Sequence, residues 1–298
     1  MEPYVRSSFE TTRPLDLLRT LAPIGLGPSL RLDGRDAWRA TRTPAGLATV
    51  HLRRVEGQVE VEAWGPGAAW AAAQSPSLCG EDDDASGFTA RHKLIGDLHR
   101  RHPGVRMPKT RAVFEALIPA VLAQKVTTIE AEAAYRALMR SWGEPAPGPV
   151  RMRIAPSARV IASTPYWAFH KLGVERRRAE VIIRAARSAS RLEETVEMDM
   201  PSAYRRLAAF PGIGPWTAAK VASVALGDAD AVPVGDYHLP NTVGYALEGT
   251  ARSTDARMLE LLDPYRGHRG RVIRLLLLSG IRAPRFGPKQ PLRDFVAS

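Results

Sequence analysis

The sequence predicts an α+β protein in which an N-terminal antiparallel sheet with helices precedes an all-α domain. Two observations support this prediction. Apolar and polar residues alternate between residues 38 and 64, and from about residue 88 onward the apolar residues recur at spacings of three and four. We place the β-rich domain at residues 1–105, the helical domain at 106–284 and a basic tail at 285–298. A chain of 298 residues is long enough for two such domains.

The predicted strands are short segments with the period of a half-buried sheet. They are residues 38–43, 47–53 and 59–64. Gly46 and Gly57 lie between these segments and favour turns, so we expect an antiparallel meander. A short helix can begin within 66–73, and the acidic stretch 81–87 is expected to be a solvent-exposed loop.

The helical part consists of short segments separated by glycine or proline. They are residues 111–124, 129–142, 155–163, 175–190, 201–209, 217–226, 239–247, 254–262 and 268–280. Ser157, Ser202 and Thr254 are expected to cap helix starts, because their hydroxyls can accept bonds from unpaired backbone N–H groups. Glycines are expected to end several helices; they are Gly143, Gly227, Gly249 and Gly280.

Composition restricts the classes of partner and cofactor. The 42 basic residues exceed the 31 acidic ones by 11, which favours a polyanionic partner. No apolar run approaches the roughly 20 residues that cross a membrane, and no secretory signal is recognised, so we expect a cytoplasmic, nucleoid-associated protein. Cys79 is the single cysteine, which excludes an internal disulfide and a four-thiolate iron–sulfur cluster.

The most informative segment is the sequence FPGIGPWTAA at 210–219, between two predicted helices. Gly212 and Gly214 permit positive φ and leave backbone N–H groups uncovered beside a helix N-terminus, which is an arrangement that binds anions. Pro215 suits the first helical turn, and Ile213 can fill the space between the two helices. A tight helical hairpin without a ligand is the alternative, but the basic chain favours a hairpin that binds phosphate.

On these residues the chain resembles the helix-hairpin-helix DNA glycosylases, within them the alkyladenine (3-methyladenine) DNA glycosylase II branch. The family signature is Pro-Gly-(Ile/Val)-Gly, a helix, and an Asp about two dozen residues later; here Asp236 follows Gly212 by 24 residues. Segments 114–126 and 264–269 are similar to the family's first core helix and to the segment before its final helix. The resemblance therefore spans about 110–282 and implies a helix-hairpin-helix glycosylase domain.

The resemblance implies that Asp236 is the catalytic carboxylate, whereas an isolated Asp at this position is more often a helix cap. Cleavage of an N-glycosidic bond develops oxocarbenium character on the sugar, which a carboxylate can stabilise, or it can activate a water. Bifunctional relatives carry a lysine two positions after the hairpin, where this chain has Trp216. The implied activity is that of a monofunctional glycosylase that flips and excises alkylated purines of the 3-methyladenine type from damaged double-stranded DNA.

The same resemblance implies a base pocket lined by Trp216, Tyr237, His268 and Lys220. The two aromatic rings could stack on an electron-poor, cationic purine. His268 stands where the family has a tryptophan, and Lys220 stands where the branch often has an aromatic residue.

Contacts with DNA are expected from Gly212, Gly214, Thr217, Gln124, Lys125 and Arg269. Lys125 occupies the wedge position, Gln124 could bond the orphaned opposite base, and Arg269 is expected near Asp236 or the DNA. The resemblance also implies a monovalent cation, Na⁺ or K⁺, at the carbonyls of Ala208, Phe210 and Ile213. No organic cofactor and no partner subunit are expected.

Two other functions remain open. One is a bifunctional glycosylase/AP lyase on oxidised bases, with Lys220 as the attacking amine; Trp216 and the lone cysteine argue against it. The other is a non-catalytic helix-hairpin-helix DNA-binding protein. Asp236 argues against that alternative, since simple backbone binding gives no reason to place a carboxylate near phosphates.

Overall fold

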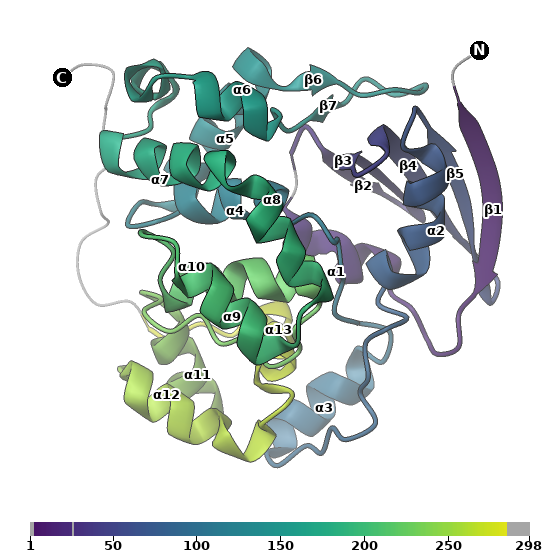
Figure 1. The fold of residues 1–298 in the computed structure, drawn as a ribbon. Helices are drawn as coiled ribbons and strands as arrows, with labels where there is room; N and C mark the ends of the chain where they lie inside the picture. The colour runs from purple at the N-terminus through teal and green to yellow at the C-terminus, as the bar shows by residue number, and fades with distance from the viewer. Residues whose placement is uncertain (1–2, 26, 285–298) are drawn as a thin grey trace.

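The computed structural model describes residues 3–25 and 27–284 of the chain. A five-stranded antiparallel sheet occupies the N-terminal part, and helices make up most of the remainder (Figure 1). The predicted α+β class is therefore confirmed. The basic tail predicted at 285–298 lies outside the described residues. Within the described ranges, no helix has both the length and the apolar character needed to cross a membrane.

The sheet has the strand order β1-β5-β4-β3-β2. Its strands are β1 (Tyr4–Glu10), β2 (Leu30–Asp33), β3 (Asp36–Thr43), β4 (Gly46–Val55) and β5 (Gln58–Trp64). The three predicted strands and both turns are confirmed, with φ of +125° at Gly46 and +73° at Gly57. The strands that the pattern missed, β1 and β2, are the two edges of the sheet, where exposure on both sides weakens the alternation.

One face of the sheet packs on two helices, α1 (Leu17–Leu21) and α2 (Ala68–Leu78), and the turn η1 (Ala22–Ile24) follows α1. The register pairs Ala37 with Leu52 and Leu52 with Val61, so these side chains share the buried face. We call this unit the sheet lobe. Part of its other face is covered by a small hairpin, β6 (Glu144–Pro145) and β7 (Arg153–Ile154).

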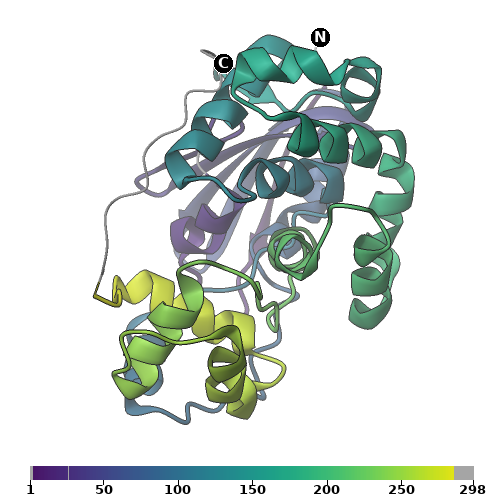
Figure 2. The same cartoon turned by 90° about the vertical axis from the view of Figure 1, so that its left-hand side faces the viewer.

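The helices form two further cores, separated in Figure 2. The upper helical lobe contains α4 (Val113–Leu122), α5 (Thr128–Trp142), α6 (Ala158–Ser163), η2 (Tyr166–Leu172), α7 (Arg176–Arg187), α8 (Ala189–Glu193), η3 (Glu194–Glu197), α9 (Met200–Ala208), α10 (Pro215–Val221) and the π-helical turn η4 (Ala222–Leu226). The lower helical lobe contains α3 (Lys93–Arg101), α11 (Leu239–Glu248), α12 (Asp255–Leu262), η5 (Asp263–Tyr265) and α13 (Arg269–Ser279). Helix α3 thus packs with the C-terminal helices, although it precedes residue 105, where we predicted the domain boundary.

The expected helix ends are largely observed. The hydroxyls of Ser157 and Thr254 accept backbone bonds at the starts of α6 and α12. Ser202 is not a cap: the Asp199 carboxylate accepts the Ser202 N–H at 2.8 Å, so α9 begins earlier than expected. Glycines in the left-handed region follow η4, α11 and α13; they are Gly227, Gly249 and Gly280. Gly143 ends α5 with extended backbone instead.

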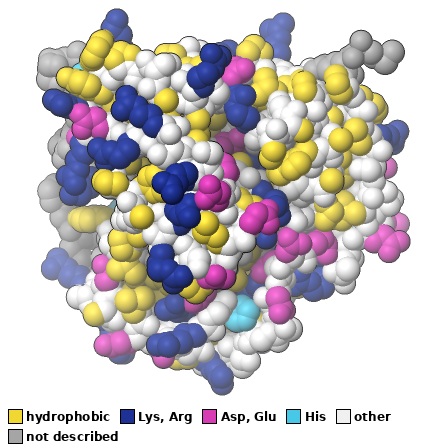
Figure 3. Space-filling model, in the orientation of Figure 1, with side chains coloured by type: hydrophobic (Ala, Val, Ile, Leu, Met, Phe, Trp, Pro, Cys, Tyr) yellow, Lys and Arg dark blue, Asp and Glu magenta, His cyan; other side chains and the backbone are white. Residues whose placement is uncertain are grey.

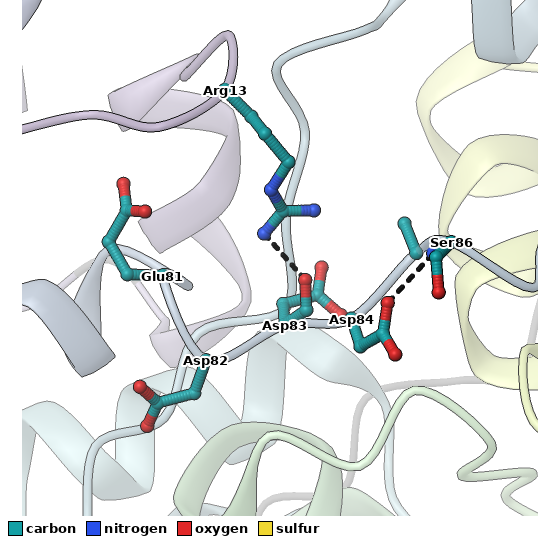
Figure 4. A pocket seen from close by; sticks show the side chains of 7 residues that line it. Arg13, Glu81, Asp82, Asp83, Asp84 and Ser86 are labelled. Carbon is teal, nitrogen blue, oxygen red and sulfur yellow. Dashed lines mark hydrogen bonds between the residues drawn. The ribbon is translucent and has the colours of Figure 1, made fainter.

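The prediction of an exposed acidic loop at 81–87 is wrong at its centre. Asp83 is only 7% exposed, and its carboxylate accepts bonds from both terminal nitrogens of Arg271, at 3.0 and 2.5 Å. It also accepts the Met107 N–H at 2.9 Å, and the Asp83 carbonyl accepts a bond from Arg13 at 2.5 Å (Figure 4). A buried carboxylate must be paired in this way, and the pairing joins the lower helical lobe to the segments that follow α2 and precede α4.

Removal of the Asp83 carboxylate leaves the buried Arg271 guanidinium unpaired. We expect Asp83→Ala to lower the free energy of unfolding by roughly 3–5 kcal/mol, measured by urea denaturation. The control is Glu132→Ala, which removes an exposed ion pair with Arg136 on α5 and should cost less than about 1 kcal/mol. Equal losses in the two variants would show that the Asp83 pair does not hold the lobes together.

Candidate active site

The segment between α9 and α10 forms the predicted hairpin. Gly212 has φ +95°, and a β-carbon there would lie 2.3 Å from the Val181 Cγ2 of α7. Gly214 has nothing within 4 Å of the equivalent position, so the hairpin is pressed onto α7 on one side and open on the other. Ile213 is 3% exposed within the upper-lobe core, as expected. The exposed glycine backbone precedes the N-terminus of α10, which is the geometry of an anion site.

Side chains from α7 and from the loop after α4 hold this hairpin. The Gln124 Nε2 donates to the Gly212 carbonyl at 2.9 Å and to the Thr217 hydroxyl at 2.8 Å. Arg184 donates to the Pro211 carbonyl at 2.9 Å. Thr217 is 2% exposed, which argues against the expected contact of its hydroxyl with a phosphate. The Gln124 side-chain nitrogen therefore positions the hairpin, and only its amide oxygen takes no part in these bonds.

Asp236 lies in the loop that leads from the upper helical lobe into α11 of the lower one. Its Oδ1 accepts the backbone N–H groups of His238 at 2.9 Å and Leu239 at 3.0 Å, so the carboxylate caps the first turn of α11. Its Oδ2 accepts the indole N–H of Trp216 at 2.9 Å. An ionised carboxylate offers about four acceptor positions, and Asp236 is half-buried, so an acceptor position remains for a substrate.

Lys220 lies four residues after Trp216 on α10, on the same helical face. Its side chain is exposed to solvent; desolvation lowers its pKa, while the negative charge of Asp236 raises it. Trp216 and Lys220 both lie beside Asp236, where the resemblance implied a base pocket. The adjacent Tyr237 is 86% exposed and contacts the His238 ring edge-on.

Two expected residues have their contacts elsewhere. His268 meets the Phe88 ring edge-on at a centroid distance of 5.6 Å, and desolvation together with the Arg271 charge lowers its pKa. Arg269 forms a two-bond ion pair with Asp230, which also accepts the Arg269 backbone N–H at 3.0 Å. The Arg269 guanidinium therefore stabilises the start of α13, and no described bond joins it to Asp236.

Lys125 is one of two non-glycine residues with positive φ among those described, at +56°. Such backbone is uncommon for a side-chain-bearing residue and is often found at functional sites. Lys125 is exposed beside Gln124, which bonds the hairpin, so the predicted wedge lies near the hairpin.

Sequence reasoning missed the capping box that starts α5, although Thr127-x-x-Glu130 is its usual pattern. No local signal indicated the role of Arg184.

Part of the chain is similar in sequence to a known protein. No protein-family model matches the chain. Over 128 residues it is 32% identical to DNA-3-methyladenine glycosylase 2 of Escherichia coli, covering 42% of this chain and 45% of that protein. The chain therefore spans about half the length of this curated relative.

Solved structures share the fold. A 3-methyladenine DNA-glycosylase from Archaeoglobus fulgidus matches with a TM-score of 0.73 and 20% identity, over 92% of this chain and 98% of that one. An 8-oxoguanine glycosylase/lyase of Clostridium acetobutylicum, in complex with double-stranded DNA, matches with a TM-score of 0.72 and 12% identity, over 94% and 97%. At these identities the likeness establishes the fold and does not distinguish the two activities.

The chain thus has the fold of these solved DNA glycosylases, and part of its sequence is similar to DNA-3-methyladenine glycosylase 2 of Escherichia coli.

The two hairpin glycines differ in their surroundings, because Gly212 packs against Val181 and Gly214 faces open space. Alanine variants at the two positions should therefore have different effects. We expect Gly212→Ala to lower the free energy of unfolding by at least about 2 kcal/mol, because it combines positive φ with the overlap on Val181. Gly214→Ala meets open space and should cost less than about 1 kcal/mol. Its methyl group should instead weaken binding of plain duplex DNA by roughly tenfold, about 1.4 kcal/mol.

Urea denaturation and fluorescence anisotropy with a labelled duplex measure the two effects. A Gly214→Ala variant that is stable and binds DNA at full affinity would show that the hairpin backbone does not touch phosphate.

Proposed function

We propose that the chain is a monofunctional DNA glycosylase that flips alkylated purines of the 3-methyladenine type out of damaged duplex DNA and hydrolyses their glycosidic bond. The placement of Asp236 carries this proposal. One carboxylate oxygen caps α11, the other bonds Trp216, and Trp216 lies on the helix that begins at the hairpin. A single chain supplies both the hairpin and the carboxylate, so we also propose a monomer, acting in the cytoplasm on nucleoid DNA.

The chemistry follows from the carboxylate. The hairpin amides hold a phosphate beside the lesion, and the flipped purine enters beside Trp216. As the C1′–N9 bond breaks, its electron pair leaves with the purine, and the Asp236 carboxylate stabilises the positive charge that develops on the sugar. Water then adds at C1′ and loses a proton to Asp236 or to solvent. A purine that already carries a positive charge leaves as a neutral base and needs no acid.

The charge distribution supports DNA as the partner. The chain carries a net charge of +11, and Lys and Arg side chains are spread over the helical part of the face in Figure 3. Helix α7, which touches the hairpin through Val181 and Arg184, carries exposed arginines; they are Arg176, Arg177, Arg184 and Arg187. We propose that Lys125 and Gln124 face the same duplex, with Lys125 as the wedge.

The hairpin carbonyls fit a monovalent cation. In the described structure, the carbonyls of Ala208 and Ile213 accept no hydrogen bond, whereas that of Phe210 accepts the Ile213 N–H at 3.0 Å and has a second lone pair. We propose that these three carbonyls hold Na⁺ or K⁺. The ion would add positive charge beside the amides that bind phosphate.

A second candidate is a bifunctional glycosylase/lyase on oxidised bases. The lowered pKa of Lys220 favours it, since attack on the sugar needs a neutral amine. Trp216, in the position of the lysine of bifunctional relatives, favours the monofunctional enzyme. A non-catalytic DNA-binding module is the third candidate. It would bind DNA without releasing a base, whereas both enzymes would release one.

The proposal is tested with duplex DNA that carries methylated purines, by assaying released base and borohydride-trapped complex. We expect base release without trapping, and a loss of at least about 100-fold in Asp236→Asn, because the amide has no charge to offer the sugar. The control is Asp263→Asn, which removes an exposed carboxylate paired with Arg266 and should keep full activity. Full activity in Asp236→Asn would refute the mechanism, and binding without release would identify the module.

A further inference from the structure

The loop between α4 and α5, residues 123–126, carries Lys125 in a conformation that a lysine does not favour by itself. Its φ of +56° lies in the left-handed region, and such backbone persists only where the surroundings hold it. The Lys125 side chain is exposed, and no hydrogen bond or ion pair joins it to another described residue. The conformation of Lys125 must therefore be set by the contacts of its neighbours in the loop.

Arg178 of α7 holds the start of this loop from inside the upper helical lobe. Its side chain is among the largest that are fully buried, and its Nη1 donates to the carbonyl of Leu122 at 2.6 Å. Leu122 is the last residue of α4, and a cation suits this end of a helix because the carbonyls there carry partial negative charge. The Glu175 carboxylate lies 3.5 Å from the Arg178 Nε. The contact with Leu122 thus fixes the point at which the chain leaves α4.

Two further contacts hold the rest of the loop. The Gln124 Nε2 donates to the carbonyl of Gly212 in the hairpin at 2.9 Å. At the far end of the loop, Thr127 and Glu130 form the capping box that starts α5. Lys125 therefore lies between three fixed points, and its position is tied to that of the hairpin.

We infer that Arg178 and Gln124 are positioning residues that hold Lys125 as a preorganised wedge. This inference rests on the proposed function, in which Lys125 fills the space that a flipped purine leaves in the duplex. Flipping already costs the energy of unstacking and unpairing the base. A loop that is fixed before DNA binds adds no further cost for its own ordering. The four-carbon stem of Lys125 can then fill the gap while its ammonium stays at a phosphate.

A positioning role has a consequence that depends on how firmly the damaged base is paired. A wedge helps only with the cost of taking the base out of the helix, and this cost is smallest for a mismatched base. Loss of the held wedge should therefore slow the release of a paired lesion much more than the release of a mismatched one. A general loss of folded protein would instead slow both by the same factor.

The test uses two duplexes that carry 7-methylguanine, opposite cytosine in one and opposite adenine in the other, in single-turnover assays of released base. We expect Arg178→Met and Lys125→Ala each to slow release from the paired duplex by at least about tenfold, and release from the mismatched duplex by less than about threefold. Arg153→Met is the matched control, because Arg153 donates to the Met139 carbonyl at 2.7 Å, near the end of α5 that lies away from the loop. It should change both rates by the same factor.

A double variant shows whether Arg178 acts through Lys125. If it does, the variant that combines Arg178→Met with Lys125→Ala should release the paired lesion no more slowly than Lys125→Ala alone. Because Arg178 is buried, urea denaturation first establishes that Arg178→Met is folded. Gln124→Met repeats the test at a half-buried position should Arg178→Met fail to fold, since methionine has a similar length but no donor for the hairpin carbonyl. It should show the same selective loss on the paired duplex.

The outcomes separate this inference from the function on which it rests. If the unaltered protein released 7-methylguanine from neither duplex, the proposed function would fail. If Lys125→Ala released it from both at the original rates, the proposed wedge would be wrong, and the positioning roles with it. If only Lys125→Ala were selectively slow, or if the losses multiplied in the double variant, the positioning role would be wrong while the glycosylase and its wedge stood.

Discussion

The buried ion pair between Asp83 and Arg271 joins the lower helical lobe to the segment between α2 and α3. The Asp83 carboxylate bonds α13 of the lower helical lobe and the Met107 N–H ahead of α4, while its carbonyl bonds Arg13 beside the sheet lobe. Neither charge could be buried alone, so the pair is satisfied only when the lobes are assembled. The pair thereby holds the lower helical lobe against the segments that follow α2 and precede α4.

The carboxylate of Asp236 joins the two helical lobes directly. Two of its hydrogen-bond donors, His238 and Leu239, belong to the start of α11 in the lower lobe, and the third, Trp216, belongs to α10 in the upper lobe. The Trp216 helix begins at the hairpin that is open toward Gly214. The hairpin and the Asp236 carboxylate are thus joined through α10, so a phosphate held at the hairpin, as proposed, would lie at a fixed distance from the carboxylate.

Local patterns were enough to predict most of the fold. Alternation of apolar and polar residues identified the three central strands but not the edge strands β1 and β2. The glycines indicated the hairpin, and the structure gives the reason for one of them: a β-carbon at Gly212 would overlap Val181. The resemblance to the glycosylase family implied that Trp216, Lys220 and Asp236 share one site. Pairings across long sequence separations could not be predicted: Asp83 meets Arg271 188 residues away, and Arg269 pairs with Asp230 rather than approaching Asp236. Such contacts depend on how distant segments pack together, and the local spacing of apolar residues in the sequence carries no information about that packing.

The central claim is that Asp236 stabilises positive charge on the sugar, and binding of a charged abasic analogue tests it most directly. The analogue is a duplex with a pyrrolidine in place of the sugar, cationic at neutral pH, and its neutral counterpart is a tetrahydrofuran. The account predicts that the protein binds the cationic duplex more tightly, and that Asp236→Asn removes this preference while it keeps the affinity for the neutral duplex. An unchanged preference in Asp236→Asn would contradict the account.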